Sequence, residues 1–375
     1  MSFESVEREI DAAIERRVFP GAVLLVRQGN RVFYHRAFGY RTLEPERTPM
    51  KEDTIFDLSS LTKPLATTLA ILVLVREGKL ALDDRFTRFF HNFGVHGKTH
   101  VTFRHLLSHS SGLPAWRPYY KKILQVERKR GRINFLGSPA AKAFVYQEIH
   151  RERPEFPPGT RALYSDLGFM LLGETVEEIS GVSLDRFCQD RIYRPLGLRA
   201  LSFVDLSLVR TRRVELVLDM IAPTERCPWR KKLLWGEVHD DNAYAMGGVA
   251  GHAGLFGSAR DIEALVTRLQ RCYEGKDSFF PPDLVRTFWT RDESVPGSTW
   301  ALGWDTPSPR GSSTGSRFSP HTVGHLGFTG TSVWLDLEKD LLVVFLTNRV
   351  HPTRENDEIR EFRPRLHDLV VEAVR

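Results

Sequence analysis

Residues 60–75 read SLTKPLATTLAILVLV, and this stretch decides the fold. It opens with a Ser-x-x-Lys and continues as a long apolar run, which is typical of a buried helix. Gly78 follows the run, where the C′ glycine of a helix is expected. Because positions i and i+3 share one helix face, Ser60 and Lys63 can meet. Buried neighbours would lower the pKa of Lys63, and an amine that can lose its proton activates a neighbouring hydroxyl as a nucleophile.

The composition is that of an ordinary globular chain. The 375 residues, 41% hydrophobic and 27% charged, suit one large or two medium domains with a sizeable core. Three scattered cysteines are too few for a disulfide framework or a zinc site. The N-terminus lacks a secretory signal, and the run 64–75 is too short to span a membrane. We therefore expect a cytoplasmic protein without membrane contacts.

Strand signals lie near both ends of the chain. Residues 21–28 and 31–39 flank Gly29-Asn30 as in a β-hairpin, and two further strands are indicated at 331–336 and 341–347. Helices are indicated at 4–17, 101–109, 139–150, 165–180, 183–194 and 355–374.

This distribution predicts an α/β (α+β) fold. An antiparallel sheet flanked by helices would be built from residues 1–83 and 246–375, and a mainly helical domain, 84–245, would be inserted between them. The segment 247–257, GGVAGHAGLFG, lacks the Gly-Lys-Ser/Thr ending of a phosphate loop. We expect it to form closely packed backbone behind the active site.

A second motif is Tyr164-Ser165-Asp166, at the entrance of an apolar helical segment. A tyrosine aimed at a lysine ammonium has its pKa lowered and can act as a general base. Asp166 could reach the same cleft as a hydrogen-bond acceptor. The alternative interpretation is a capping Ser165 or Asp166 beside a packed tyrosine.

A third motif is GHLGFTGT, residues 324–331. Its three glycines allow the backbone to approach a ligand closely, and N–H groups on such a strand edge can bind an oxyanion. Taken alone, the motif is also compatible with a glycine-rich strand end that contains a structural histidine.

Together, Ser60-x-x-Lys63, Tyr164-Ser165-Asp166 and His325-Leu326-Gly327 resemble the motifs of the serine β-lactamase and penicillin-binding-protein superfamily. The Tyr-x-Asx and His-x-Gly forms are similar to the branch of class C β-lactamases, D-Ala-D-Ala carboxypeptidases and related esterases. The resemblance covers about residues 20–350. It implies a β-lactamase/transpeptidase-like fold with the active site between the two domains and with no metal or organic cofactor.

The resemblance also implies roles for the matching residues. Ser60 would be the acylated nucleophile, and Lys63 and Tyr164 would share proton transfer. The backbone N–H groups of Ser60 and Phe328 would form the oxyanion hole. His325, where many relatives have lysine, could hydrogen-bond Tyr164 or a substrate carboxylate.

Two positions bear on the substrate. Gly327 would contact it from the strand edge, and so would Asp166, which replaces the asparagine of the common pattern. A carboxylate cannot donate to a substrate amide carbonyl unless it is protonated. This departure argues against efficient β-lactam binding and leaves esters and other peptides open.

The implied reaction is hydrolysis of an amide or ester through an acyl-Ser60 intermediate. The substrate would be a β-lactam or a short D-amino-acid peptide. One alternative is a carboxylesterase that uses the same site on small acyl esters. Another is a scaffold or binding protein that keeps the fold without turnover.

Other partners are not indicated. Basic residues cluster between 117 and 132, but without base-stacking aromatics or a known nucleic-acid module. The run could instead be a solvated face or a rim that attracts anionic substrates. His105 and His109 have i, i+4 spacing, but no third metal ligand lies nearby. Trp116, Tyr119 and Tyr120 are candidates for the cleft wall, with core packing as the alternative.

Overall fold

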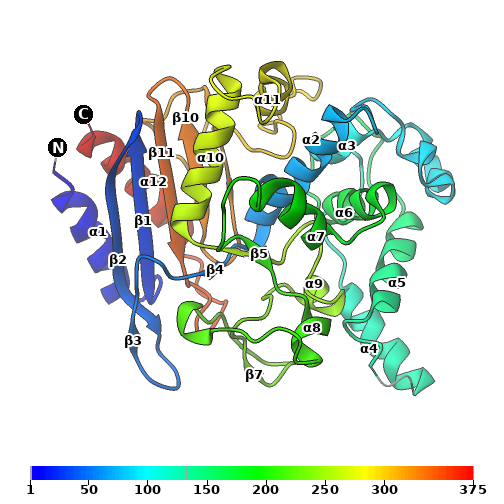
Figure 1. The fold of residues 1–375 in the computed structure, drawn as a ribbon, viewed down its shortest axis with the longest axis horizontal. Helices are drawn as coiled ribbons and strands as arrows, with labels where there is room; N and C mark the ends of the chain where they lie inside the picture. Colours follow the sequence, from blue (N-terminus) through cyan, green and yellow to red (C-terminus); the bar gives the residue numbers. More distant parts are fainter. Residues whose placement is uncertain (1, 132–133, 375) are drawn as a thin grey trace.

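A six-stranded antiparallel sheet forms the centre of the protein, shown in Figure 1 as a computed structural model that describes residues 2–131 and 134–374. The strand order is β3-β2-β1-β11-β10-β9, so strands from both ends of the chain lie side by side. The bounds are β1 Gly21–Gln28, β2 Arg31–Thr42, β3 Thr48–Pro49, β9 Thr322–Leu326, β10 Ser332–Asp336 and β11 Leu341–Thr347.

Both faces of the two central strands are buried, which explains why their sequences are continuously apolar instead of alternating. In β1, Val23 and Leu25 belong to one core cluster, whereas Leu24 and Val26 belong to another. In β11, successive side chains likewise alternate between the two clusters. The sheet therefore separates two hydrophobic layers.

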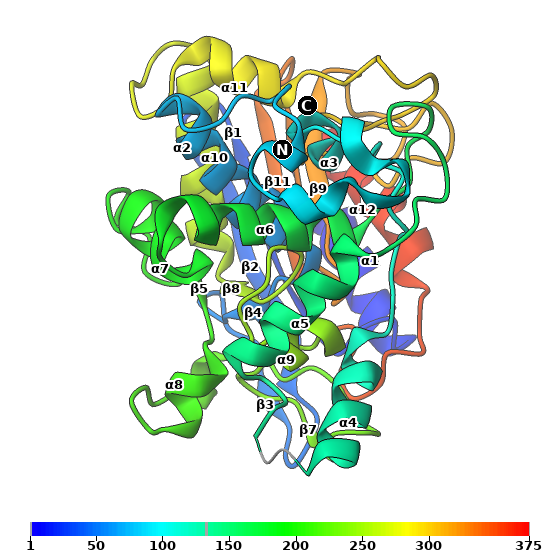
Figure 2. The same cartoon turned by 90° about the vertical axis from the view of Figure 1, so that its right-hand side faces the viewer.

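Helices cover both faces of this sheet. Helices α1 (Glu4–Glu15) and α12 (Ile359–Ala373) pack on one face, and α10 (Ala259–Tyr273) packs on the other (Figure 1). The remaining helices are α2 Thr68–Arg76, α3 Phe103–Leu107, α4 Tyr119–Arg130, α5 Pro139–His150, α6 Asp166–Ser180, α7 Leu184–Cys188, α8 Leu206–Arg210, α9 Asp241–Ala245 and α11 Pro282–Trp289. Figure 2 shows α5 and α6 in front of the sheet, on the side of the predicted insertion.

The predicted α/β class with an antiparallel sheet flanked by helices is confirmed. Residues 84–245 hold helices α3 to α9, and their described part also contains the two-residue strands β5 (Ser202–Phe203), β6 (Arg226–Cys227) and β7 (Lys232–Leu233). Strand β5 joins β4 (Phe56–Asp57) and β8 (Leu255–Gly257) in a small second sheet. Helices α4, α8, α9, α10 and α11 are additional to those that the sequence patterns predict.

The segment that contains Ser60 and Lys63 is irregular at its start. Residues Ser59–Leu61 form a 3₁₀ turn, Lys63–Thr67 a π-helical turn, and α2 follows. Pro64 has no N–H to offer the Ser60 carbonyl, which accounts for the departure from α-helical bonding. Among the described helices, Ser59–Arg76 is long and apolar enough to cross a membrane, but 83% of it is buried within the protein, as expected of a core helix.

Candidate active site

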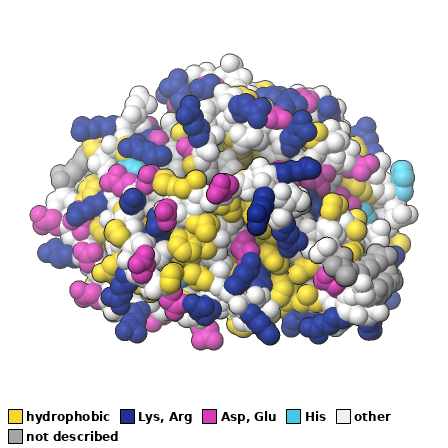
Figure 3. All heavy atoms as spheres, turned by 60° about the horizontal axis from the view of Figure 1, so that its bottom comes forward, with side chains coloured by type: hydrophobic (Ala, Val, Ile, Leu, Met, Phe, Trp, Pro, Cys, Tyr) yellow, Lys and Arg dark blue, Asp and Glu magenta, His cyan; other side chains and the backbone are white. Residues whose placement is uncertain are grey.

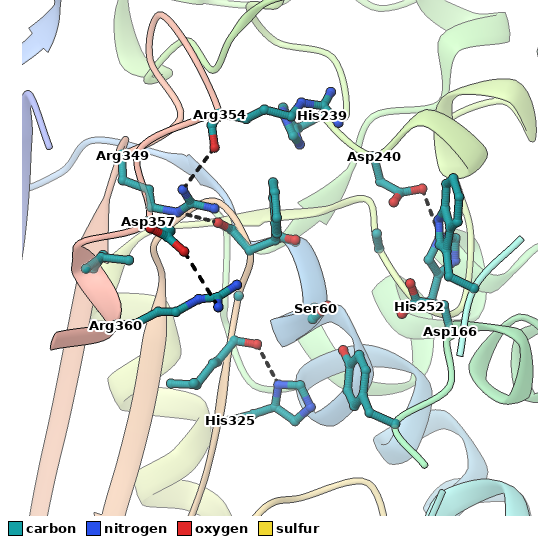
Figure 4. A pocket seen from close by; sticks show the side chains of 18 of the residues that line it. Ser60, Asp166, His239, Asp240, His252, His325, Arg349, Arg354, Asp357 and Arg360 are labelled. Carbon is teal, nitrogen blue, oxygen red and sulfur yellow. Dashed lines mark hydrogen bonds and ion pairs between the residues drawn. The ribbon is translucent and has the colours of Figure 1, made fainter. Parts of the chain in front are cut away.

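A cavity of about 630 Å³ brings the three motifs together. Ser60 lines its floor, and Lys63 lies behind Ser60, fully buried and outside the lining. Figure 4 shows Ser60 between two walls, with Asp166 and His252 on one side and Arg349 and Arg360 on the other. The predicted site residues that line the cavity are Ser60, Tyr164, Asp166, His325, Gly327 and Phe328.

Lys63 is the centre of the polar contacts at this floor. Its Nζ lies 3.1 Å from Ser60 Oγ, 3.0 Å from the carbonyl oxygen of His252 and 2.8 Å from Asp166 Oδ1. The ammonium also lies 4.8 Å from the centre of the Tyr164 ring. The His252 carbonyl belongs to the segment 247–257, which was expected behind the site; His252 and Ala253 of this segment line the cavity itself.

The expected pKa shifts of two residues are wrong in direction. Burial alone would lower the pKa of Lys63, but the carboxylate of Asp166 and the hydroxyl of Tyr164 outweigh it, so that the pKa is raised. Burial raises the pKa of Tyr164, and the Lys63 ammonium offsets only part of this effect. At neutral pH the site therefore holds an ammonium and a neutral phenol.

Residues before Ser60 tie it to the glycine-rich turn. The Asp57 carboxylate accepts the N–H of Ser59 at 2.8 Å, and the Asp57 carbonyl accepts the Thr329 hydroxyl at 2.7 Å. The Leu58 carbonyl accepts the Thr331 hydroxyl at 3.1 Å. These bonds fix the start of the Ser60 segment against the turn that contains Phe328.

Two buried arginines brace the same turn from its other side. Arg349 Nε donates to the Phe328 carbonyl at 2.8 Å, and Arg363 donates to the Gly327 carbonyl at 3.2 Å. The Phe328 side chain is 48% exposed and stacks on His239, with ring centres 5.6 Å apart. The sequence has four arginines between residues 349 and 363, and this cluster could have pointed to the two bracing arginines. None of the three motifs includes them.

Tyr164 is held by aromatic neighbours. It packs on Trp300, with ring centres 5.4 Å apart, and on His109, at 4.7 Å. His109 Nδ1 accepts the N–H of Ser165 at 3.0 Å, which places its proton on Nε2. Burial and the Lys63 charge lower the pKa of His109 well below its ordinary value. His109 is thus a neutral residue that positions the Tyr164 motif.

His325 differs from its expected behaviour. Its Nδ1–H donates to the Leu326 carbonyl at 2.7 Å, and no hydrogen bond joins it to Tyr164 in the described structure. Burial, followed by the Lys63 charge, lowers the pKa of His325 to about 3. His325 is therefore neutral near pH 7, so it presents no positive charge to a substrate carboxylate. Its Nε2 keeps a lone pair that can accept a hydrogen bond.

The basic run between 117 and 132 does not supply the cavity wall. None of its described residues lines the cavity, although the neighbouring Trp116 does. Residue 132 lies outside the described residues. On the face shown in Figure 3, lysine and arginine side chains are interspersed with acidic and apolar ones. The cationic side chains at the cavity are instead those of Arg349, Arg354, Arg360 and Arg363.

Asp305, a further residue of the cavity wall, gives the site a pH-dependent stability. Burial raises its pKa to about 6, although Oδ1 accepts the Thr299 hydroxyl at 2.7 Å and the Thr306 N–H at 2.9 Å. The folded protein therefore binds this proton more tightly than the unfolded chain. The resulting stabilisation is present below about pH 4 and is lost as the pH rises through about 6.

Replacing Asp305 with asparagine should remove this loss, because the amide oxygen accepts the same two bonds and does not titrate. We compare the free energy of unfolding of Asp305→Asn with that of the wild type at each pH. The difference should be about 2 kcal/mol more favourable to the variant at pH 8 than at pH 4. Urea unfolding at both pH values measures the difference. Asp53→Asn, at an exposed carboxylate, is the control. An equal effect of Asp305→Asn at both pH values would contradict the assignment.

The fold and this arrangement define a β-lactamase-type hydrolase, and the chain belongs to the Beta-lactamase family, whose model matches residues 6–365. An Escherichia coli (strain K12) protein provisionally named D-alanyl-D-alanine carboxypeptidase is 34% identical over 378 residues, which cover 92% of this chain and 83% of that protein. The family predicted from the motifs is thus confirmed.

Solved structures share this fold. The octameric penicillin-binding protein homologue from Pyrococcus abyssi matches with a TM-score of 0.74 at 23% identity, over 99% of this chain and 78% of that chain. EstCE1, a hydrolase with promiscuous acyltransferase activity, matches with a TM-score of 0.71 at 23% identity, over 97% of each chain. At these identities the likeness shows the fold alone.

Proposed function

We propose that this protein is a serine hydrolase that releases a C-terminal D-amino acid from short peptides through an acyl-Ser60 intermediate. The observation that carries the proposal is the 3.1 Å contact between Ser60 Oγ and Lys63 Nζ at the floor of a substrate-sized cavity. The name of the 34% identical relative supports the peptide substrate.

In this mechanism Ser60 Oγ attacks the scissile carbonyl carbon. The backbone N–H groups of Ser60 and Phe328 stabilise the oxyanion, with help from the positive end of the Ser60 helix. Tyr164 keeps its proton and can donate a hydrogen bond to the leaving group. Water then hydrolyses the acyl-enzyme.

A carboxylesterase is the second candidate, and Asp166 favours it. Its carboxylate is paired with Lys63 and cannot donate to the amide carbonyl of a peptide or β-lactam side chain. A simple ester does not need that bond. Trp116 and Phe328, 43% and 48% exposed, add apolar surface to the cavity that suits an acyl chain.

One set of probes separates the candidates. The wild type and Ser60→Ala are incubated with an acylated Lys-D-Ala-D-Ala peptide, its L-Ala-L-Ala isomer, a chromogenic cephalosporin and p-nitrophenyl butyrate. We expect release of D-alanine from the first peptide only and a mass increase of the wild type alone. Activity limited to the ester would select the second candidate. Turnover that survives in Ser60→Ala would contradict the nucleophile, and the absence of any adduct would favour a non-catalytic protein.

A further inference from the structure

Asp166 is the carboxylate that contacts Lys63, and the backbone holds it there. Ser165 caps α6, because its hydroxyl accepts the N–H of Gly168 at 3.3 Å, so the Asp166 side chain is not needed for capping. The Asp166 N–H donates to the Ala115 carbonyl at 2.9 Å. With α6 fixed in this way, Asp166 Oδ1 lies 2.8 Å from Lys63 Nζ.

This pairing changes what Lys63 can do. An ammonium has three N–H donors, and the oxygen atoms within reach of Lys63 are those of Ser60, His252 and Asp166 and the hydroxyl of Tyr164. The charged form is therefore fully satisfied. An ammonium has no lone pair and cannot accept the Ser60 proton until it has given up one of its own. Asp166 is an acceptor in direct contact with it.

We propose that Asp166 is the final proton acceptor when Ser60 is acylated, with Lys63 as the relay; this rests on the proposed function. As the bond from Ser60 Oγ to the carbonyl carbon forms, the Oγ proton moves to Lys63 Nζ. Lys63 gives another proton to Asp166 Oδ1 in the same step. Asp166 becomes a carboxylic acid, Lys63 stays an ammonium, and the negative charge moves to the carbonyl oxygen.

The return path balances this step. When the tetrahedral intermediate collapses and the bond to the leaving group breaks, the leaving nitrogen or oxygen takes a proton from Lys63. Asp166 then returns its proton to Lys63, and the starting ion pair is restored. No oxidant, reductant or further reactant is required.

Burial makes the transfer across this pair accessible. Desolvation penalises the charged pair, an ammonium beside a carboxylate, but not the neutral pair, an amine beside a carboxylic acid. The free energies of the two forms therefore differ less in a buried pair than they do in water. The Asp166 side chain is 18% exposed and that of Lys63 is fully buried. A proton can therefore cross the 2.8 Å contact without a large rearrangement.

Most other ionisable groups around the pair are not competing proton acceptors. His109 and His325 are neutral but do not contact Ser60 or Lys63 by any described hydrogen bond, and their pKa values lie well below 7. Tyr164 hydrogen-bonds both Ser60 and Lys63, but burial raises its pKa, so that it retains its proton at neutral pH. Besides the arginines, the other titratable side chains that line the cavity are His239, Asp240, Asp241, His252, Asp305 and Asp357, and His252 is paired with Asp240 at 2.9 Å.

The test is the pH dependence of acylation in Asp166→Asn. The amide oxygen can still accept from Lys63 but cannot take its proton. The burst of p-nitrophenol from p-nitrophenyl butyrate is measured between pH 5 and 10, in an Asp305→Asn background so that Asp305 does not titrate. We expect acylation at pH 7 to fall by about 10²–10⁴-fold, with most of the loss recovered by pH 10 as Lys63 itself deprotonates.

Two further measurements separate the relay from a merely structural role. Asp166→Glu keeps a carboxylate and should recover part of the rate at pH 7, and urea unfolding checks that each variant is folded. A loss that is uniform at all pH values, or an Asp166→Asn rate within threefold of the wild type, would overturn the relay. If the wild type forms no Ser60 adduct with any probe, the proposed function fails and the relay fails with it.

Discussion

Replacing Lys63 with methionine is expected to lower kcat/KM by on the order of 10³–10⁴-fold, because Ser60 loses its contact with the group that activates it. The same change leaves the Asp166 carboxylate without its cation. We therefore also expect a loss of about 3 kcal/mol in the free energy of unfolding. Ester hydrolysis and urea unfolding measure the two effects on the same preparation.

The double variant Lys63→Met, Asp166→Asn separates the two effects. Removing the unpaired charge should restore most of the stability, to within about 1 kcal/mol of the wild type. Activity should stay as low as in the single variant. If activity returns together with stability, Lys63 only supports the fold, and the proposed activation of Ser60 is incorrect.

Replacing Gly251 with alanine is expected to cause a comparably large loss of stability. A Cβ at this position would lie 2.0 Å from the Phe169 carbonyl oxygen and 2.9 Å from the Gly173 nitrogen, both in the backbone of α6. Helix backbone cannot yield as a flexible side chain can, so the loop must move away. We expect a loss of about 3 kcal/mol, measured by urea unfolding.

The displacement should also reduce acylation, because this loop contacts the Ser60 segment. The Gly251 carbonyl accepts the Thr67 hydroxyl at 2.7 Å, and the next carbonyl accepts from Lys63. Gly94→Ala is the matched control, since its nearest neighbour, a methyl group of Thr87, would lie at 3.4 Å. It should change stability by less than about 0.5 kcal/mol. A similar small change in Gly251→Ala would show that the loop is free to shift.

Local patterns were sufficient for the parts of the fold that depend on neighbouring residues. The β1–β2 hairpin follows from Gly29-Asn30 and its apolar flanks, and the core helix follows from the apolar run after Lys63. Helix α10 could also have been predicted from the sequence, because Ile262, Leu265 and Leu269 recur at helical spacing; in the structure all three are buried. Helix α4 is harder to recognise, since its sequence is dominated by charges.

The motifs locate the candidate site but not its electrostatics. The pairing of Lys63 with Asp166 depends on how α6 docks against the Ser60 segment, and no spacing within either motif encodes it. For this reason the expected direction of the Lys63 pKa was wrong. The neutrality of His325 has the same origin, because it depends on burial and on the nearby Lys63 charge.

The pairing of β1 with β11 has a consequence for the order in which the protein is made. Ala22 lies opposite Thr347 in this pair, so the central sheet cannot close until residue 347 has left the ribosome. Ser60 emerges early, but the turn around Phe328 and its bracing arginines emerge late. Such non-local pairing slows folding. A nascent chain therefore displays Ser60 long before the turn around Phe328 can be placed beside it, and the candidate site can form only after residue 347 has been made.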